Sequence, residues 1–130
     1  MQKPLTIGRL AKAAGINLET IRYYQRIGLL KEPPKPQNGY RVYPQAFITR
    51  IRFIKRAQQL GFKLCEVAEL LQLGDGQCED VCARAEQKRQ QITQQILDLE
   101  NLRNTLDGLI NTCYNNSENT YCPIIETLTD

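Results

Sequence analysis

The sequence predicts a mainly α-helical protein in which four short helices precede one long helix and a small wing interrupts the series. Three observations predict this fold class. Apolar residues recur at helical spacing through most of the chain, and glycines follow where these series end. Four prolines and an Asn-Gly pair gather in the stretch 31–44. From Cys78 to Cys113, glycine occurs only at Gly108 and proline does not occur.

A first helix is expected from Thr6 to Ala14 and a second from Asn17 up to Gly28, on the two sides of a turn at Gly15. Thr6 and Asn17 suit the N-cap position, because their side-chain oxygens can accept backbone N–H groups that the first turn leaves unpaired. Glycine suits the end of each helix because it adopts the left-handed conformation readily. Two short helices across a glycine turn predict a helix-turn-helix.

The proline-rich stretch 31–44 predicts a small β-hairpin, or wing, beside that motif. A third helix is expected to have Pro44 at its first position and to end at Gly61. A fourth helix from Leu64 to Leu73 ends at a Gly-Asp-Gly sequence. Residues 1–74 are therefore expected to form a winged helix-turn-helix domain with two following helices.

The long helix expected from Cys78 to Cys113 carries an apolar stripe whose steps alternate between three and four residues, which is typical of a coiled coil. A single stripe on a polar helix requires a partner helix, so residues 75–113 are expected to form a dimerisation helix. Residues 114–130 are expected to form a loop and a short terminal helix. The stripe consists of Ile92, Ile96, Leu99, Leu106 and Ile110.

Composition narrows the classes of function. The chain has no histidine, so a catalytic histidine is impossible and any soft-metal site must be built from thiolates. No apolar run approaches the roughly 20 residues of a membrane helix, and the start of the sequence does not read as a secretion signal. We expect a cytoplasmic protein that is not an enzyme and has no membrane partner. Five cysteines, an odd number, then indicate metal or redox chemistry rather than a disulfide framework.

The second helix and the wing carry polar, basic and aromatic side chains, which predict a surface for double-stranded DNA. Polar groups on the helix suit base edges and phosphates, and an arginine between tyrosines in the wing suits a phosphate or the minor groove. The stretch 41–56 adds five basic residues and no acidic one. A solvated helix beside a turn that packs its own tyrosines explains these features less well together. The candidates are Asn17, Glu19, Thr20, Arg22 and Tyr23 in the helix, with Arg26 on the same polar face, and Tyr40, Arg41 and Tyr43 in the wing.

Three cysteines, Cys78, Cys113 and Cys122, form a second set of candidate residues. A rise of 1.5 Å per residue separates the first two by about 50 Å along one straight helix. If two long helices pair antiparallel, Cys78 of one subunit meets Cys113 and Cys122 of the other, and symmetry creates two such sites. Three thiolates without histidine suit a soft, thiophilic ion. The simpler alternative is that each cysteine is a small buried apolar residue.

The remaining cysteines leave alternatives open. Cys65 is expected to be a lone thiol early in the fourth helix. Cys82 shares a helix face with Cys78, four residues earlier, and is a candidate accessory ligand. The same pair also allows a thiol redox sensor that works through a reversible disulfide. A metal-binding buffer without specific DNA affinity is a further alternative.

The sequence resembles the MerR family of metal-responsive regulators, in its mercury-sensing branch, over nearly the whole chain. The resemblance implies a homodimer that binds promoter DNA with an overlong spacer and twists it when metal binds, so that RNA polymerase can open the promoter. In members that respond to monovalent copper or silver, serine typically replaces Cys78 and the loop is one residue shorter. The motifs that carry the resemblance are LTIGRLAKAAGINLETIRYYQRIGLL, GYRVY, RIRFIKRAQQLGF, GQCED and a terminal C-x8-C followed by PII.

Within this family the resemblance implies mercury(II), Hg(2+), as the inducer, held by three thiolates. Similar zinc sensors usually add a second cysteine before the first loop cysteine and a histidine in the loop, whereas this chain has Thr112 and no histidine. Lead and cadmium sensors often carry further cysteine or histidine in a C-terminal extension, whereas this sequence ends at Asp130. Sensing of lead, cadmium or zinc remains the alternative.

Overall fold

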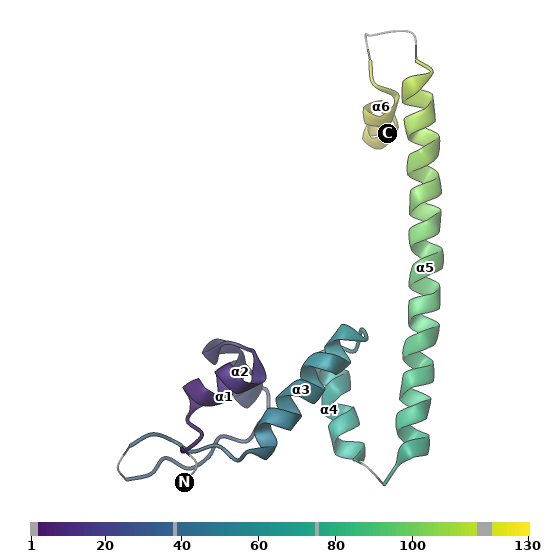
Figure 1. The fold of residues 1–130 in the computed structure, drawn as a ribbon. Helices are drawn as coiled ribbons and strands as arrows, with labels where there is room; N and C mark the ends of the chain where they lie inside the picture. The colour runs from purple at the N-terminus through teal and green to yellow at the C-terminus, as the bar shows by residue number, and fades with distance from the viewer. Residues whose placement is uncertain (1–2, 38, 75, 117–120) are drawn as a thin grey trace. The chain divides into compact units, whose positions relative to one another are not determined.

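The structure, a computed structural model, describes residues 3–37, 39–74, 76–116 and 121–130. Within them the chain forms six helices and no strand (Figure 1). It divides into two compact units, residues 1–81 and 82–130, so that the boundary falls in the first turn of the long helix. The helices are α1 (Ile7–Ala14), α2 (Leu18–Arg26), α3 (Ala46–Gln59), α4 (Leu64–Leu73), α5 (Cys78–Tyr114) and α6 (Pro123–Thr129).

The caps of α1 and α2 form as the sequence predicts. The Thr6 hydroxyl accepts the backbone N–H of Arg9 at 3.4 Å. The Asn17 Oδ1 accepts the backbone N–H of Thr20 at 2.8 Å. Gly15 ends α1 with φ of 73°, a left-handed conformation that a side chain would strain. The predicted helix-turn-helix is confirmed.

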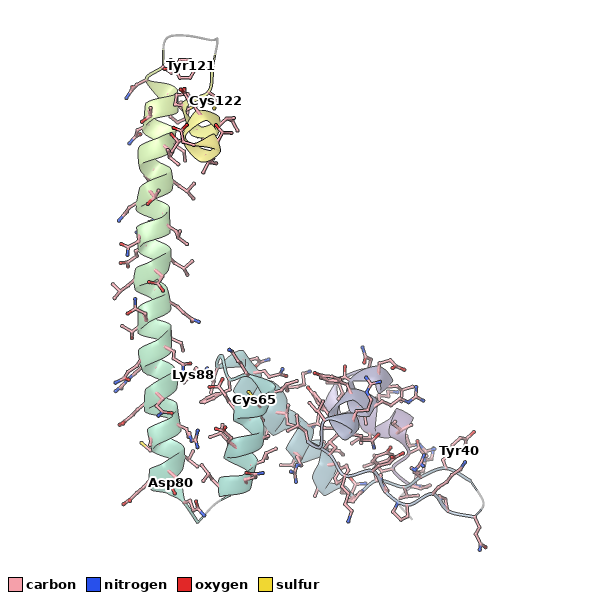
Figure 2. All side chains as sticks on the ribbon, turned by 180° about the vertical axis from the view of Figure 1, so that it is seen from behind. Tyr40, Cys65, Asp80, Lys88, Tyr121 and Cys122 are labelled. Atoms are coloured by element: carbon pink, nitrogen blue, oxygen red, sulfur yellow. The ribbon has the colours of Figure 1, made fainter. Side chains whose placement is uncertain are left out.

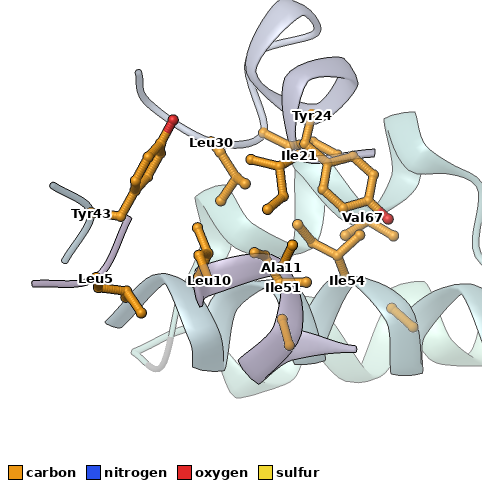
Figure 3. Close-up of a cluster of buried hydrophobic side chains, with 13 residues drawn as sticks. Leu5, Leu10, Ala11, Ile21, Tyr24, Leu30, Tyr43, Ile51, Ile54 and Val67 are labelled. Atoms are coloured by element: carbon orange, nitrogen blue, oxygen red, sulfur yellow. The ribbon is translucent and has the colours of Figure 1, made fainter. Parts of the chain in front are cut away.

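The first unit has one apolar core, which fixes α1 and α2 against α3. Figure 3 shows Ile21 of α2 and Leu30 facing Ile54 of α3. Burial of each such side chain contributes about 1.5–3 kcal/mol, so the core dominates the stability of this unit. The α2 surface that faces away from the core is thereby held in a fixed orientation. The completely buried large side chains are Leu10, Ile21, Leu30, Ile51, Ile54 and Val67.

The stretch 31–45 differs from the expected β-hairpin. It is an extended loop without a strand in its described residues, and Asn38 of the expected turn lies outside them. Its prolines have no N–H to donate to a strand ladder, which explains the difference. The Tyr43 N–H instead donates to the Leu5 carbonyl at 2.8 Å and ties the end of the loop to the segment before α1.

The next two helices follow the prediction with one shift. The third helix begins at Ala46, two residues after Pro44, which was expected at its first position. Gly61, with φ of 95°, follows its end. The fourth helix spans Leu64–Leu73 as predicted.

In the second unit, α5 continues to Tyr114 and α6 lies beside its last turns (Figure 1). The apolar stripe of α5 is exposed in the single chain, with Leu99 64% and Ile96 51% accessible. Such a stripe needs a covering surface, as the sequence predicts. None of the helices in the described residues is long and apolar enough to cross a membrane.

Candidate DNA-binding surface and thiol pair

The N-terminal turn of α2 uses part of its polar side chains within the helix. The Asn17 Oδ1 accepts both the backbone N–H and the hydroxyl of Thr20, each at 2.8 Å. Both predicted DNA-binding residues therefore also build the cap. The amide nitrogen of Asn17 takes no part in these two bonds and keeps a donor for an outside partner.

The exposed side of α2 presents Glu19, Arg22 and Tyr23 to solvent. Arg22 Nη1 donates to Glu19 Oε1 at 2.8 Å, and both side chains are more than half accessible. The guanidinium of Arg26 lies 5.7 Å from the centre of the Tyr23 ring, a cation–π distance. Arg26 thus belongs to the same surface as Arg22 and Tyr23, as its place on the polar face of the helix predicts.

Next to this surface, Tyr24 faces inward. Its ring is buried, and its hydroxyl donates to Gln58 Oε1 at 3.3 Å. Burial raises the pKa of the Tyr24 hydroxyl. The two adjacent tyrosines therefore have different environments, because Tyr23 is exposed to solvent while Tyr24 joins α2 to α3.

The wing meets α2 at a cleft of about 500 Å³. Its lining combines residues of α2 with residues of the loop, and three arginines contribute to it. Concentrated positive charge beside tyrosine hydroxyls is the chemistry that binds a phosphodiester backbone. The lining residues are Ile7, Arg22, Gln25, Arg26, Glu32, Tyr40, Arg41 and Tyr43.

The two wing tyrosines have different environments. Tyr40 is 81% accessible and stands on the outer part of the loop (Figure 2). Tyr43 is only 4% accessible, and its hydroxyl accepts the side-chain N–H of Gln25 at 2.9 Å. The structure therefore places Tyr43 as the link between the wing and α2, while Tyr40 is exposed to solvent.

Part of the basic stretch on α3 forms a smaller cleft with the end of α1. Arg52, Lys55 and Arg56 line it together with Ala14. Lys55 Nζ donates to the Gly15 carbonyl at 3.0 Å, which places a positive charge at the C-terminal end of the α1 dipole. Lys55 therefore supports the fold of the helix-turn-helix as well as its positive charge.

The structure brings Cys113 and Cys122 together at the C-terminal end of α5. Cys113 lies in the last turn of α5 and Cys122 is the N-cap residue of α6, and each of the two thiols shifts the pKa of the other. Figure 2 shows Cys122 between the end of α5 and α6. Two of the three predicted ligands thus form a pair in one chain.

The two thiols differ in acidity. Backbone N–H groups of Ile125 and Ile124 lower the pKa of Cys122, because they donate to its thiolate. Desolvation raises the pKa of Cys113, and the negative charge and hydrogen bond of Cys122 raise it further. Cys122 therefore loses its proton more readily than Cys113, and two neighbouring sulfurs suit a soft cation.

The other three cysteines are separate and exposed. Cys65 lies near the start of α4, Cys78 begins α5, and Cys82 follows it by one helical turn. No group of three metal-binding side chains forms within the described residues of one chain. The helix length agrees with this, since α5 separates Cys78 from Cys113 by about 50 Å.

Comparison with known proteins finds relatives over nearly the whole chain. The family model described as MerR HTH family regulatory protein matches residues 5–73, and the model described as MerR, DNA binding, matches residues 48–109. A mercuric resistance operon regulatory protein of Serratia marcescens is 50% identical over 125 residues, which cover 95% of this chain and 87% of that protein.

Two solved structures resemble the chain over nearly its full length. A MerR regulator of Bacillus megaterium in complex with mercury(II) is 39% identical, with a TM-score of 0.76 and coverage of 96% of this chain and 99% of that one. A transcription regulator of Ralstonia metallidurans in complex with lead(II) is 29% identical, with a TM-score of 0.82 and coverage of 98% and 99%.

Proposed function

Because the chain belongs to the MerR family of helix-turn-helix regulators, we propose that it activates transcription in response to mercury(II). It binds promoter DNA as a homodimer, and mercury binding distorts the DNA so that RNA polymerase can open it. The observation that carries this proposal is the contact between Cys113 and Cys122 in a chain whose N-terminal unit presents a DNA-binding surface.

The thiol pair supports a metal function for the C-terminal end. A cysteine must lose its proton before it binds a metal, and the lowered pKa of Cys122 makes this loss easier. Cys113 supplies the second sulfur when its proton leaves. A bound soft cation stabilises both thiolates, which removes the cost of placing two negative charges side by side.

The third ligand is proposed to be Cys78 of the partner subunit. The exposed stripe on α5 supports an antiparallel pairing of two long helices, since each stripe then covers the other. This pairing brings the start of one α5 to the end of the other. Residues 1–74 serve as the DNA-binding domain, 75–113 as the dimerisation helix and 114–130 as the metal-binding end, in a cytoplasmic protein.

Lead(II) is the second candidate inducer, because the lead-bound structure has the higher TM-score, 0.82 against 0.76. Sequence identity favours the mercury-bound regulator, 39% against 29%. The donor set also favours mercury. The chain offers thiolates and no histidine, and thiolates select the softest ions.

The test compares metals on the reduced dimer. Absorbance titrations with mercury(II), lead(II), cadmium(II), zinc(II) and copper(I) run beside transcription from a promoter that the protein binds. We expect mercury(II) to bind first and to activate at the lowest concentration. A stronger response to lead would replace mercury as the inducer, and a response to diamide without metal would favour the Cys78/Cys82 redox sensor.

A mixing experiment tests the shared site. Cys78→Ser protein is combined with a Cys113→Ser/Cys122→Ser double variant, and the subunits are exchanged. Heterodimers then contain one intact site if the ligands come from both chains. Mixtures that bind no mercury, while wild type does, contradict the shared site.

A further inference from the structure

The only described acidic residue that lines the cleft between the wing and α2 is Glu32, and it contacts the wing arginine. Glu32 Oε1 lies 3.2 Å from Arg41 Nη2. Arg41 Nε also donates to the Pro33 carbonyl at 3.1 Å. Two neighbouring residues of the loop therefore hold the guanidinium at two points.

These contacts leave binding capacity on Arg41. A guanidinium has five N–H donors, and the contacts with Glu32 and Pro33 use two of them, so three remain. The side chain is 37% accessible, which allows an outside oxygen to reach those donors. Arg41 can thus keep its partners in the loop and still bind a phosphate.

The described residues of the wing form no β-strand that would hold the backbone around Arg41 in place. No strand ladder supports residues 31–37 and 39–45, and Arg41 lies between the exposed Tyr40 and Val42. A long arginine side chain on such a loop loses rotamer freedom when it binds, and prior fixation reduces that loss. Contacts with Glu32 and Pro33 supply the fixation.

We propose that Glu32 is a positioning residue for DNA binding, which acts by holding Arg41 ready for a backbone phosphate. This inference rests on the DNA-binding part of the proposed function and is independent of the metal. Exposed ion pairs contribute little to folding stability, and the Glu32 side chain is 55% accessible. The effect of Glu32 therefore belongs to DNA affinity.

An opposite role for Glu32 makes an opposite prediction. A carboxylate near DNA repels phosphates. If Glu32 only competed with the DNA phosphates for Arg41, it would weaken DNA binding. Its removal would then tighten binding, and Glu32→Gln and Glu32→Ala would act alike because both remove the charge. Under the positioning role the two variants differ, because the glutamine oxygen can still accept from Arg41 while alanine cannot.

The experiment uses the full-length, metal-free protein and a fluorescent duplex selected from a random library for binding to wild type. Anisotropy at fixed salt gives the affinities of Glu32→Ala, Glu32→Gln, Arg41→Ala and the Glu32→Ala/Arg41→Ala double variant. Glu79→Ala is the control, since it removes the same charge from the first turn of α5. We expect Glu32→Ala to bind about three- to tenfold more weakly, from the lost fixation of one side chain.

The remaining variants separate the roles. Glu32→Gln and Glu79→Ala should bind close to wild type, and the double variant should bind as weakly as Arg41→Ala alone. Tighter or unchanged binding by Glu32→Ala, or additive losses in the double variant, would overturn the proposal. Arg41→Ala should also lower the slope of log affinity against log salt by about 1. An unchanged slope there would remove Arg41 from the DNA surface, whereas failure to select any duplex would contradict the proposed function itself.

Discussion

The two units of the chain obtain their stability in different ways. Every described apolar side chain that is fully buried belongs to residues 5–70, whereas α5 and α6 bury none. The first unit closes its own core with helices less than 20 residues long. The second exposes leucine and isoleucine along a helix of 37 residues. The comparison shows that the first unit folds around a core within one chain, whereas the α5 stripe needs a second surface to cover it.

This difference predicts how each unit responds to dilution. An internal core is independent of protein concentration, but an exposed stripe is covered only in the dimer. Mutations of the first unit should therefore alter DNA binding without altering the metal site. Mutations of the α5 stripe should affect both functions together.

The largest effect is expected from Leu99→Asp, which places a charge in the middle of the α5 stripe. The carboxylate would be desolvated in the dimer, so dimer and DNA affinity should be lost together. Sedimentation should show a monomer. Circular dichroism should still show the helical signal that the folded first unit contributes. Gln90→Asp, on the opposite face of the helix, is the matched control and should stay dimeric. A dimeric Leu99→Asp protein would show that the stripe is not the interface.

Serine replacements of the three proposed ligands should have the next largest effect. Cys78→Ser, Cys113→Ser and Cys122→Ser should each abolish induction by mercury, because each removes a thiolate that a hydroxyl does not replace. DNA affinity without metal should remain, since the first unit keeps its core. Cys65→Ser is the control, and Cys82→Ser should have little effect. Normal induction in any of the three ligand variants would exclude that cysteine from the site.

Loss of a DNA contact should have a smaller effect that is confined to the first unit. Arg22→Ala and Tyr23→Ala should each weaken binding by about 1–3 kcal/mol where the side chain reads a base. Mercury affinity should stay at the wild-type value in both variants. Arg89→Ala removes a similar charge from α5 and should leave DNA binding unchanged. Gel shifts that match wild type in both variants would contradict the assignment of α2 as the recognition helix.

Local chemistry explains which parts of the fold could be predicted from the sequence. Thr6, Asn17 and Gly15 act on backbone groups within a few residues, so their roles follow from neighbouring positions alone. The end of α4 follows from the glycine after Leu73 in the same way. The proximity of Cys113 and Cys122 could also be predicted, because only eight residues separate them in the sequence.

Contacts between distant or irregular segments could not be predicted in this way. The burial of Tyr43 depends on Leu5 and Gln25, which belong to other segments of the fold. The pair of Glu32 and Arg41 lies in a loop, where no helical or strand period relates the two positions. The polar face of α2 predicts that Arg26 belongs to the DNA surface, but its position over the Tyr23 ring depends on side-chain rotamers and could not be predicted.

The smallest effect concerns the acidity of the thiol pair. Iodoacetamide reacts with thiolates, so the pH at which alkylation rises follows the pKa of each cysteine. Cys122 should react at a lower pH than a free cysteine peptide, because the N–H groups of Ile125 and Ile124 stabilise its thiolate. Cys113 should react only at a higher pH, because desolvation and the neighbouring Cys122 oppose its ionisation. Mass spectrometry of the two peptides measures both curves on the metal-free dimer.

Cys122→Ser is the control for this prediction. It removes the negative charge of the Cys122 thiolate and replaces its sulfur, which both raise the pKa of Cys113, with a neutral hydroxyl. The alkylation curve of Cys113 should then move toward lower pH, yet stay above that of the free peptide because desolvation remains. An unmoved curve would mean that the two sulfurs are apart before metal arrives. The second unit would then lack a preformed half-site, and both thiolates would be assembled only by the partner helix and the ion.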